Sequence, residues 1–148
     1  MKISDLEDKK ILILGIGREG TSTLKYLRKK FPNKLITLAD KKSLNQLEIP
    51  VQNIIKKGKF LKLSLGENYQ RDLNKFDVIF KSPGVKILKG TTAQILSQTQ
   101  IFLEIFRDKV IAVTGTKGKT TTSSLIYKIL KDAGYIVYLV GNVGNPPF

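Results

Sequence analysis

The chain has 148 residues, of which 26 are basic and 12 acidic, and it contains neither histidine nor cysteine. The missing residue types exclude disulfides, thiolate metal sites and histidine as a general base, so only oxygen ligands of the kind that hold Mg²⁺ remain. The excess positive charge lies mainly in residues 1–93, which carry 20 basic and 9 acidic side chains. The lysines of this region form short scattered clusters without a nucleic-acid-binding motif. We therefore expect a solvated surface and no nucleic acid partner.

Neither a membrane-spanning segment nor an export signal is visible in the sequence. All apolar stretches fall short of the roughly 18 residues that a membrane span needs. The N-terminal segment Met1–Asp8 is too polar for a signal peptide. We therefore expect a cytoplasmic protein with no membrane partner. We also expect the protein to be a monomer.

The first predicted unit is a strand, a glycine-rich turn and a helix. An apolar strand over 10–14 enters the turn Gly15-Ile-Gly-Arg-Glu-Gly20, a helix follows over 18–30, and a second strand over 35–39 ends in Asp40. This is the GxGxxG pattern in the context that binds a pyrophosphate, with an acidic residue about 20 positions further on. The glycines do not identify the nucleoside, so NAD(P), FAD and a UDP-linked sugar all remain open.

Further strands over 61–65 and 77–80 complete an alternating pattern, which predicts an α/β fold with a Rossmann-like parallel sheet. In such sheets, ligands lie beyond the carboxyl ends of the strands. Backbone N–H groups are expected to make the contacts at Arg18 and Glu19, because a carboxylate beside a pyrophosphate would repel it. The candidate ligand contacts are Gly15, Gly17, Arg18, Glu19, Gly20, Asp40, Lys41, Lys42, Ser82, Pro83 and Gly84.

A weaker helical pattern over 91–106 predicts the end of this first domain. We expect a domain over 1–93, a linker over 94–108 and the beginning of a second domain over 109–148. The second domain is predicted to contain a strand over 110–114, a helix over 120–133 and a strand over 135–140.

The apolar run 110–114 enters a second glycine-rich turn, which ends in Gly118-Lys-Thr120. Its glycines allow backbone N–H groups to close on phosphate oxygens, and the following helix points its positive dipole end at the same anion. Lys119 is the candidate catalytic residue, as a point charge for the outer phosphates, and the Thr120 hydroxyl is the candidate metal ligand for Mg²⁺. The residues expected to contact a nucleoside triphosphate are Gly115, Thr116, Lys117, Gly118, Lys119, Thr120 and Thr121.

This loop departs from the general phosphate-loop pattern, because Val113 occupies the position of its first glycine. The shorter form resembles the ATP-binding loop of the Mur ligase family, ATP-dependent enzymes that form amide bonds in peptidoglycan precursor synthesis. Three other stretches carry the same resemblance, which covers essentially the whole chain: Gly15–Ser22, Lys81–Val85 and Gly141–Pro146. Their order and spacing are similar to the family branch that adds D-glutamate.

The resemblance implies a Rossmann-like domain that binds a UDP-linked substrate, followed by the start of a P-loop-type α/β ATP-binding domain. It implies an amide-bond-forming ligase in which ATP with Mg²⁺ phosphorylates the carboxylate of UDP-N-acetylmuramoyl-L-alanine. The amine of D-glutamate then attacks the acyl phosphate. Asn142, in the last of the similar stretches, is added as a substrate contact.

Family members continue through the rest of the ATP domain and a third domain. The resemblance therefore implies that this chain is an N-terminal fragment without activity of its own. Two other classes stay open: a fragment of an NAD(P)-dependent oxidoreductase built on 15–40, and a nucleotide-binding module that catalyses no reaction.

Overall fold

A computed structural model of the chain describes residues 3–88, 90–141 and 146. Its centre is a five-stranded parallel sheet in the order β3-β2-β1-β4-β5. The strands are β1 (Ile11–Leu14), β2 (Ile36–Asp40), β3 (Leu61–Leu65), β4 (Val78–Lys81) and β5 (Gln94–Leu96). The predicted α/β fold class with a parallel sheet is confirmed.

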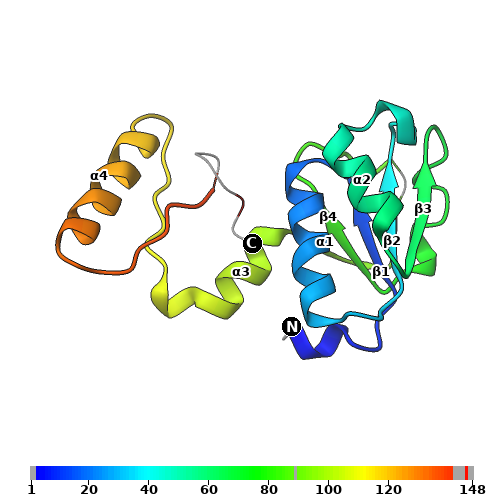
Figure 1. Cartoon of the computed structure of the whole chain (residues 1–148), viewed down its shortest axis with the longest axis horizontal. Helices are drawn as coiled ribbons and strands as arrows, with labels where there is room; N and C mark the ends of the chain where they lie inside the picture. Colours follow the sequence, from blue (N-terminus) through cyan, green and yellow to red (C-terminus); the bar gives the residue numbers. More distant parts are fainter. Residues whose placement is uncertain (1–2, 89, 142–145, 147–148) are drawn as a thin grey trace.

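Three helices pack on one face of this sheet, and Figure 1 shows α1 and α2 lying across it. They are α1 (Arg18–Lys30), α2 (Ile49–Lys57) and α3 (Gln98–Phe106). Leu27, Ile55 and Ile101 from these helices enter the same buried cluster as Ile13 of β1. Each helix follows a strand, so it starts at the carboxyl edge of the sheet. The helices α1 and α2 run back across the sheet, whereas α3 buries only Gln98 and Ile101 and leads away from it toward α4 (Figure 1).

The opposite face of the sheet is covered by turns. Leu12 and Leu14 of β1 point to this side, and they pack with Leu73 and the half-buried rings of Tyr69 and Phe76. All four residues of β1 are buried because both faces of the central strand are covered. This explains why its sequence is a continuous apolar run without alternation.

The strands predicted over 10–14, 35–39, 61–65 and 77–80 correspond to β1 to β4, and the helix predicted over 18–30 is α1. The helix predicted over 120–133 is α4 (Lys119–Asp132). Two elements were missed, α2 and β5. Single 3₁₀ turns lie at η1 (Ile3–Leu6), η2 (Leu44–Gln46), η3 (Leu73–Lys75) and η4 (Arg107–Lys109).

The sheet extends into the segment predicted as a linker. β5 pairs with β4, and the following helix buries Gln98 and Ile101. The helix predicted over 91–106 is therefore wrong in its first part, where an edge strand forms. The sheet and its core continue at least to Ile101, eight residues past the predicted end of the first domain.

The second segment is built around α4, which lies apart from the sheet and is reached through α3 (Figure 1). Within the described residues, neither 110–114 nor 135–139 forms a strand, so both strand predictions are wrong there. A strand requires a partner, and these apolar residues lack a covering layer: Ile111 is 63% and Ile136 88% exposed. Across the described ranges, none of the helices is long and apolar enough to cross a membrane.

Candidate nucleotide-binding sites

The turn between β1 and α1 uses its glycines for different purposes. Gly15 has φ +94°, and a Cβ there would lie 2.7 Å from Val85 Cγ2. A Cβ on Gly20 would lie 1.9 Å from the Gly15 carbonyl oxygen, so the first helical turn and the loop require its absence. Gly17 differs, because a Cβ there would meet nothing within 4 Å. Its missing side chain leaves open space in front of the helix.

That open space is lined by unpaired donors. In the part of the chain that the structure describes, the N–H groups of residues 17–20 have no hydrogen-bond acceptor. They are the first donors of α1, at the positive end of a helix of 13 residues. Such an arrangement binds an anion without requiring a charged side chain.

Asp40, at the end of β2, holds the neighbouring loops in place. Its Oδ2 accepts a hydrogen bond from Ile16 N at 2.7 Å, and its Oδ1 accepts one from Lys42 N at 2.9 Å. The carboxylate therefore fixes both the glycine turn and the start of the next loop. Since a carboxylate has about four lone-pair sites, it retains capacity for a ligand hydroxyl.

The Ser82 turn after β4 lies directly against the glycine turn. Ser82 Oγ donates to the Gly15 carbonyl oxygen at 3.0 Å, and Ser82 N donates to Leu14 O at 3.0 Å. Lys81 Nζ donates to the carbonyl oxygens of Ser82 and Val85 at 3.2 and 3.0 Å, which closes the turn on itself. The structure thus brings together the three loops that the sequence analysis selected.

An open cavity of 660 Å³ lies between the N-terminal half of α1 and α2. This volume is within the range of small-molecule sites, about 300–1,000 Å³. Four of the predicted contacts line it, namely Gly17, Arg18, Asp40 and Lys42. The other described candidates do not line this cavity; they are Gly15, Glu19, Gly20, Lys41, Ser82, Pro83 and Gly84. Arg18 lines the cavity and Glu19 does not, so the two acidic residues of the lining are Asp40 and Glu48.

One wall of the cavity was not anticipated. It comes from α2 and the residues before it: Leu47, Glu48, Pro50, Val51 and Ile54. The Pro in the first turn of this helix, after Glu48, was a readable start signal. The rest of the lining consists of Ile16, Thr21, Ser22, Lys25 and Pro146. Thr21 Oγ1 is buried and has no partner among the described residues, so a ligand could supply its missing hydrogen bond.

The ATP-loop candidates lie at the start of α4. Gly118 caps the helix with φ +75°, and Gly115 has φ +149°, both in conformations that favour glycine. Within the described ranges, the N–H groups of residues 115–121 have no hydrogen-bond acceptor. Seven consecutive donors at a helix N-terminus form a second candidate anion site.

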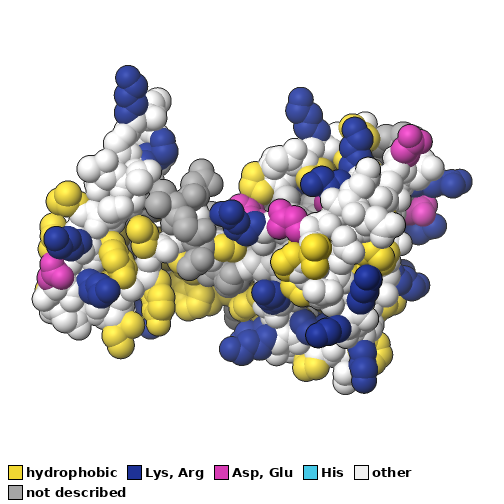
Figure 2. Space-filling view, turned by 45° about the horizontal axis from the view of Figure 1, so that its top comes forward, with side chains coloured by type: hydrophobic (Ala, Val, Ile, Leu, Met, Phe, Trp, Pro, Cys, Tyr) yellow, Lys and Arg dark blue, Asp and Glu magenta, His cyan; other side chains and the backbone are white. Residues whose placement is uncertain are grey.

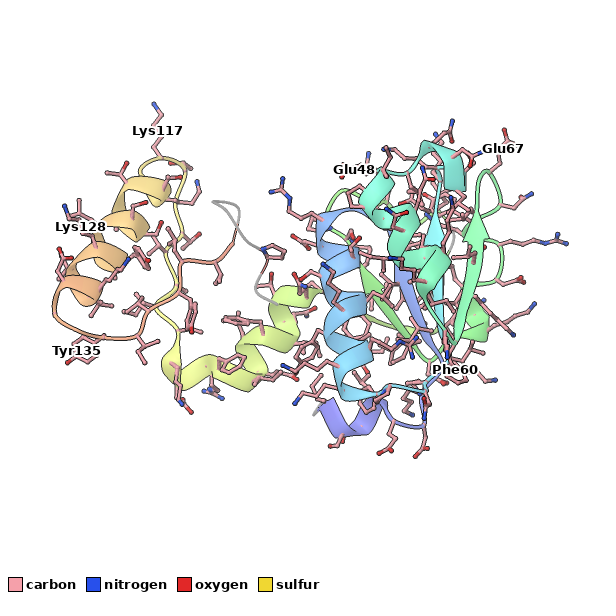
Figure 3. All side chains as sticks on the ribbon, in the orientation of Figure 1. Glu48, Phe60, Glu67, Lys117, Lys128 and Tyr135 are labelled. Atoms are coloured by element: carbon pink, nitrogen blue, oxygen red, sulfur yellow. The ribbon has the colours of Figure 1, made fainter. Side chains whose placement is uncertain are left out.

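The Lys119 ammonium group folds back over this loop, where it donates to the Gly115 carbonyl oxygen and to Thr116 O at 3.3 Å. Lys117 instead points away from the helix, as Figure 3 shows. Thr120 and Thr121 are exposed in the first turn of α4. A hydroxyl beside free amides fits an Mg²⁺ that arrives with the nucleotide, since this ion is usually held by one or two protein oxygens and by phosphates. Asn142 lies outside the described residues.

Comparison with known proteins gives two family matches. The Mur ligase MurD-like N-terminal domain matches residues 9–102, and the Mur ligase middle domain matches residues 113–147. The first match includes β5 and part of α3.

Similar curated proteins carry the name UDP-N-acetylmuramoylalanine–D-glutamate ligase. Those of Clostridium novyi (strain NT), Clostridium tetani and Acetivibrio thermocellus are 38%, 36% and 36% identical to this chain. The alignments cover 97%, 95% and 95% of the chain, but only 32%, 31% and 31% of these relatives. The chain thus spans about a third of their length.

Proposed function

Because the chain belongs to the MurD-like family of Mur ligases, we propose that it forms the substrate-nucleotide and ATP-loop part of a ligase. This ligase adds D-glutamate to UDP-N-acetylmuramoyl-L-alanine at the expense of ATP. The observation that carries the proposal is the pair of helix N-termini with free amides, at residues 17–20 and 115–121. Two separate anion sites suit a reaction that needs a nucleotide sugar and a phosphoryl donor together.

The first site would hold the diphosphate of the UDP group. The free N–H groups at the start of α1 would bind its negative charge, and Arg18 and Lys42 line the adjoining cavity. The apolar side chains of Val51 and Ile54 offer a surface for the flat uracil base and the ribose carbons. The Ser82 turn would support the glycine loop from behind, since Ser82 Oγ is bonded to the Gly15 carbonyl oxygen.

The second site would hold the outer phosphates of ATP. In the reaction, a substrate carboxylate oxygen attacks the γ-phosphorus, and ADP leaves. The amine of D-glutamate then attacks the acyl carbon, inorganic phosphate leaves, and the amine loses a proton. Lys119 would turn from its loop carbonyls to the phosphates and, with the free amides, would stabilise the charge that develops on the transferring group. Mg²⁺, when bound beside Thr120, would neutralise further phosphate charge.

The test is a titration of the 148-residue chain with UDP-N-acetylmuramoyl-L-alanine, followed by isothermal calorimetry and by thermal unfolding of the sheet domain. Binding of this compound and of UDP is expected, together with an increase in the unfolding temperature. NAD⁺ and NADP⁺ are the controls for the oxidoreductase alternative. Stabilisation by a dinucleotide without any response to the UDP compounds would reverse the assignment. The monomeric state and the cytoplasmic location remain predictions.

A further inference from the structure

The edge of the sheet opposite the cavity is strongly basic. α1 and α2 both end there, with Lys29 and Lys30 in the last turn of α1 and Lys56 and Lys57 in the last turn of α2. Lys59 follows in the turn that leads to β3. We call these five exposed lysines the basic edge. From residue 49 to residue 66 the chain contains no acidic side chain, so local ion pairs do not neutralise this part of the edge.

Two exposed apolar residues, Leu35 and Phe60, directly precede the paired strands β2 and β3 within the basic edge. The register pairs Ile36 with Leu61, and Ile36 N donates to Phe60 O at 3.0 Å, so the two backbone segments are neighbours. Leu35 is 48% and Phe60 49% exposed. Figure 3 shows Phe60 at this end of the domain, with Glu48 and Glu67 at the opposite end.

Phe60 is held in an unfavourable backbone conformation. Its φ is +55°, which makes it the one non-glycine residue with positive φ among those that the structure describes. The Cβ of an ordinary residue disfavours this region. Arg28 stabilises the arrangement, because its Nη2 donates to Phe60 O at 3.2 Å while its Nη1 donates to Pro32 O at 2.7 Å. The strained turn is thus fixed to the end of α1, and the half-exposed ring is kept at the surface.

We propose that the basic edge, with Leu35 and Phe60 at its centre, is a peripheral docking surface for an anionic lipid bilayer. Lysine ammonium groups would meet lipid phosphates, and the two apolar side chains would reach the boundary between head groups and acyl chains. Figure 2 shows Lys and Arg side chains gathered over the lower part of the sheet domain. Acidic residues also lie at this end: Glu7, whose carbonyl oxygen accepts from Lys34 Nζ, Asp8, and Asp77, whose Oδ2 accepts from Lys10 N at 2.7 Å. The five lysines of the basic edge outnumber these three.

The apolar pair favours a bilayer over a single-stranded nucleic acid. Sequence-tolerant strand binding relies on aromatic side chains that stack successive bases along a groove. Here one aromatic ring is paired with an aliphatic side chain, which gains from contact with hydrocarbon and offers no stacking surface. In a docked protein, the cavity at the carboxyl edge would face away from the membrane and stay accessible. No membrane partner was expected from the sequence, because it shows neither a membrane span nor a signal peptide, and only the fold brings these lysines together at one edge.

The test measures co-sedimentation of the 148-residue chain with vesicles. Vesicles of phosphatidylcholine containing phosphatidylglycerol are expected to bind it, with binding that weakens as salt is raised, whereas pure phosphatidylcholine is not. The triple variant Lys56→Gln/Lys57→Gln/Lys59→Gln is expected to lose roughly 100-fold in partitioning, at about fivefold for each lysine. The control triple Lys86→Gln/Lys109→Gln/Lys128→Gln has the same net charge and should stay within about twofold of the parent.

The apolar contribution is tested with Phe60→Ser, which is expected to lower partitioning roughly tenfold. Leu63→Ser is its control, at a side chain 44% exposed in the middle of β3, and should bind like the parent. Circular dichroism checks that each variant is folded. If Phe60→Ser does not fold, the comparison of the two lysine triple variants alone tests the proposal. Equal partitioning of the two lysine triples would overturn the proposal. Tight binding of a single-stranded RNA oligomer without vesicle binding would overturn it as well.

Discussion

Substitution of Gly20 by alanine is expected to destabilise the sheet domain, although Gly20 is the third residue of a helix. Alanine is the better helix former by about 1 kcal/mol, so propensity alone predicts stabilisation. The structure predicts the opposite, because the new Cβ would lie 1.9 Å from the Gly15 carbonyl oxygen and 3.0 Å from its carbon. These are backbone atoms, which cannot swing away as the end of a side chain could.

The size of the effect follows from what the displaced loop would lose. Gly15 is held by hydrogen bonds from its N to Ala39 O, at 2.8 Å, and from Ser82 Oγ to its carbonyl oxygen, at 3.0 Å. A shift large enough to accept the methyl group would break one or both, at about 1 kcal/mol each. Overpacking typically adds about 1–3 kcal/mol. After subtraction of the propensity gain, we expect Gly20→Ala to lose about 1–4 kcal/mol.

Gly17→Ala is the matched control in the same turn. A Cβ at Gly17 meets no atom within 4 Å, and its φ of −79° suits any residue. The free energy of unfolding of the Gly17→Ala variant should therefore fall by no more than about 1 kcal/mol, the usual cost of alanine at a helix N-cap. Its methyl group projects into the space in front of α1, however, so affinity for UDP-N-acetylmuramoyl-L-alanine should drop. The two variants thus separate stability from binding.

Urea unfolding, followed by far-ultraviolet circular dichroism and tyrosine fluorescence, measures both variants, since the chain contains five tyrosines and no tryptophan. Calorimetry measures their affinity for the UDP compound. If Gly20→Ala were as stable as the parent, the close approach of α1 to the Gly15 carbonyl would be incorrect. If Gly17→Ala bound the UDP compound normally, the ligand would not occupy the space in front of the helix.

Three further predictions concern other parts of the chain. Lys119→Ala should weaken Mg²⁺-dependent binding of a fluorescent ATP analogue by roughly 10–100-fold, as for a lost charge-assisted contact. Lys117→Ala should change this affinity little, because Lys117 points away from α4 (Figure 3). Equal affinities of the two variants would contradict the assigned roles. Gln98→Met should leave the free energy of unfolding unchanged or raise it by about 1 kcal/mol. The reason is that Gln98 is 3% exposed and neither polar atom of its amide has a partner among the described residues. A clear loss of stability would reveal a bonded partner. Amide hydrogen exchange should be fast in α4, which has no buried residue, and slow in β1, which is fully buried; strong protection of α4 would show that it packs on another part of the chain.

The elements that could be predicted from the sequence are those whose local signals suffice. β1, β2 and β4 are largely apolar runs bounded by turn residues, β3 alternates leucine with polar residues, and glycines mark the start of α1 and α4. β5 was missed because Gln94–Leu96 has only three residues and one buried side chain, and an edge strand is defined by its neighbour. The strand pattern over 110–114 is the reverse case, because without a paired strand an apolar run stays extended and exposed.

The candidate site was predictable in position but less so in composition. The glycine pattern located the turn, and the rule for parallel sheets located the edge. The separate roles of Gly17 and Gly20 could not be read from the sequence, because they depend on how closely α1 approaches the loop. The use of both Asp40 oxygens by backbone N–H groups, and the wall supplied by α2, also depend on contacts between elements distant in the sequence.

The structure divides the recognition of a nucleotide ligand between two elements. The anionic part would be held by main-chain donors at the start of α1, where the Asp40 carboxylate is already engaged by two N–H groups and so repels an anion less than a free carboxylate would. The apolar part would rest on Val51 and Ile54 of α2. Backbone donors bind any diphosphate, so discrimination between nucleosides would depend on the side chains of α2. Substitutions in α2 should therefore change which nucleotide binds, whereas changes at Gly17 should weaken all of them alike.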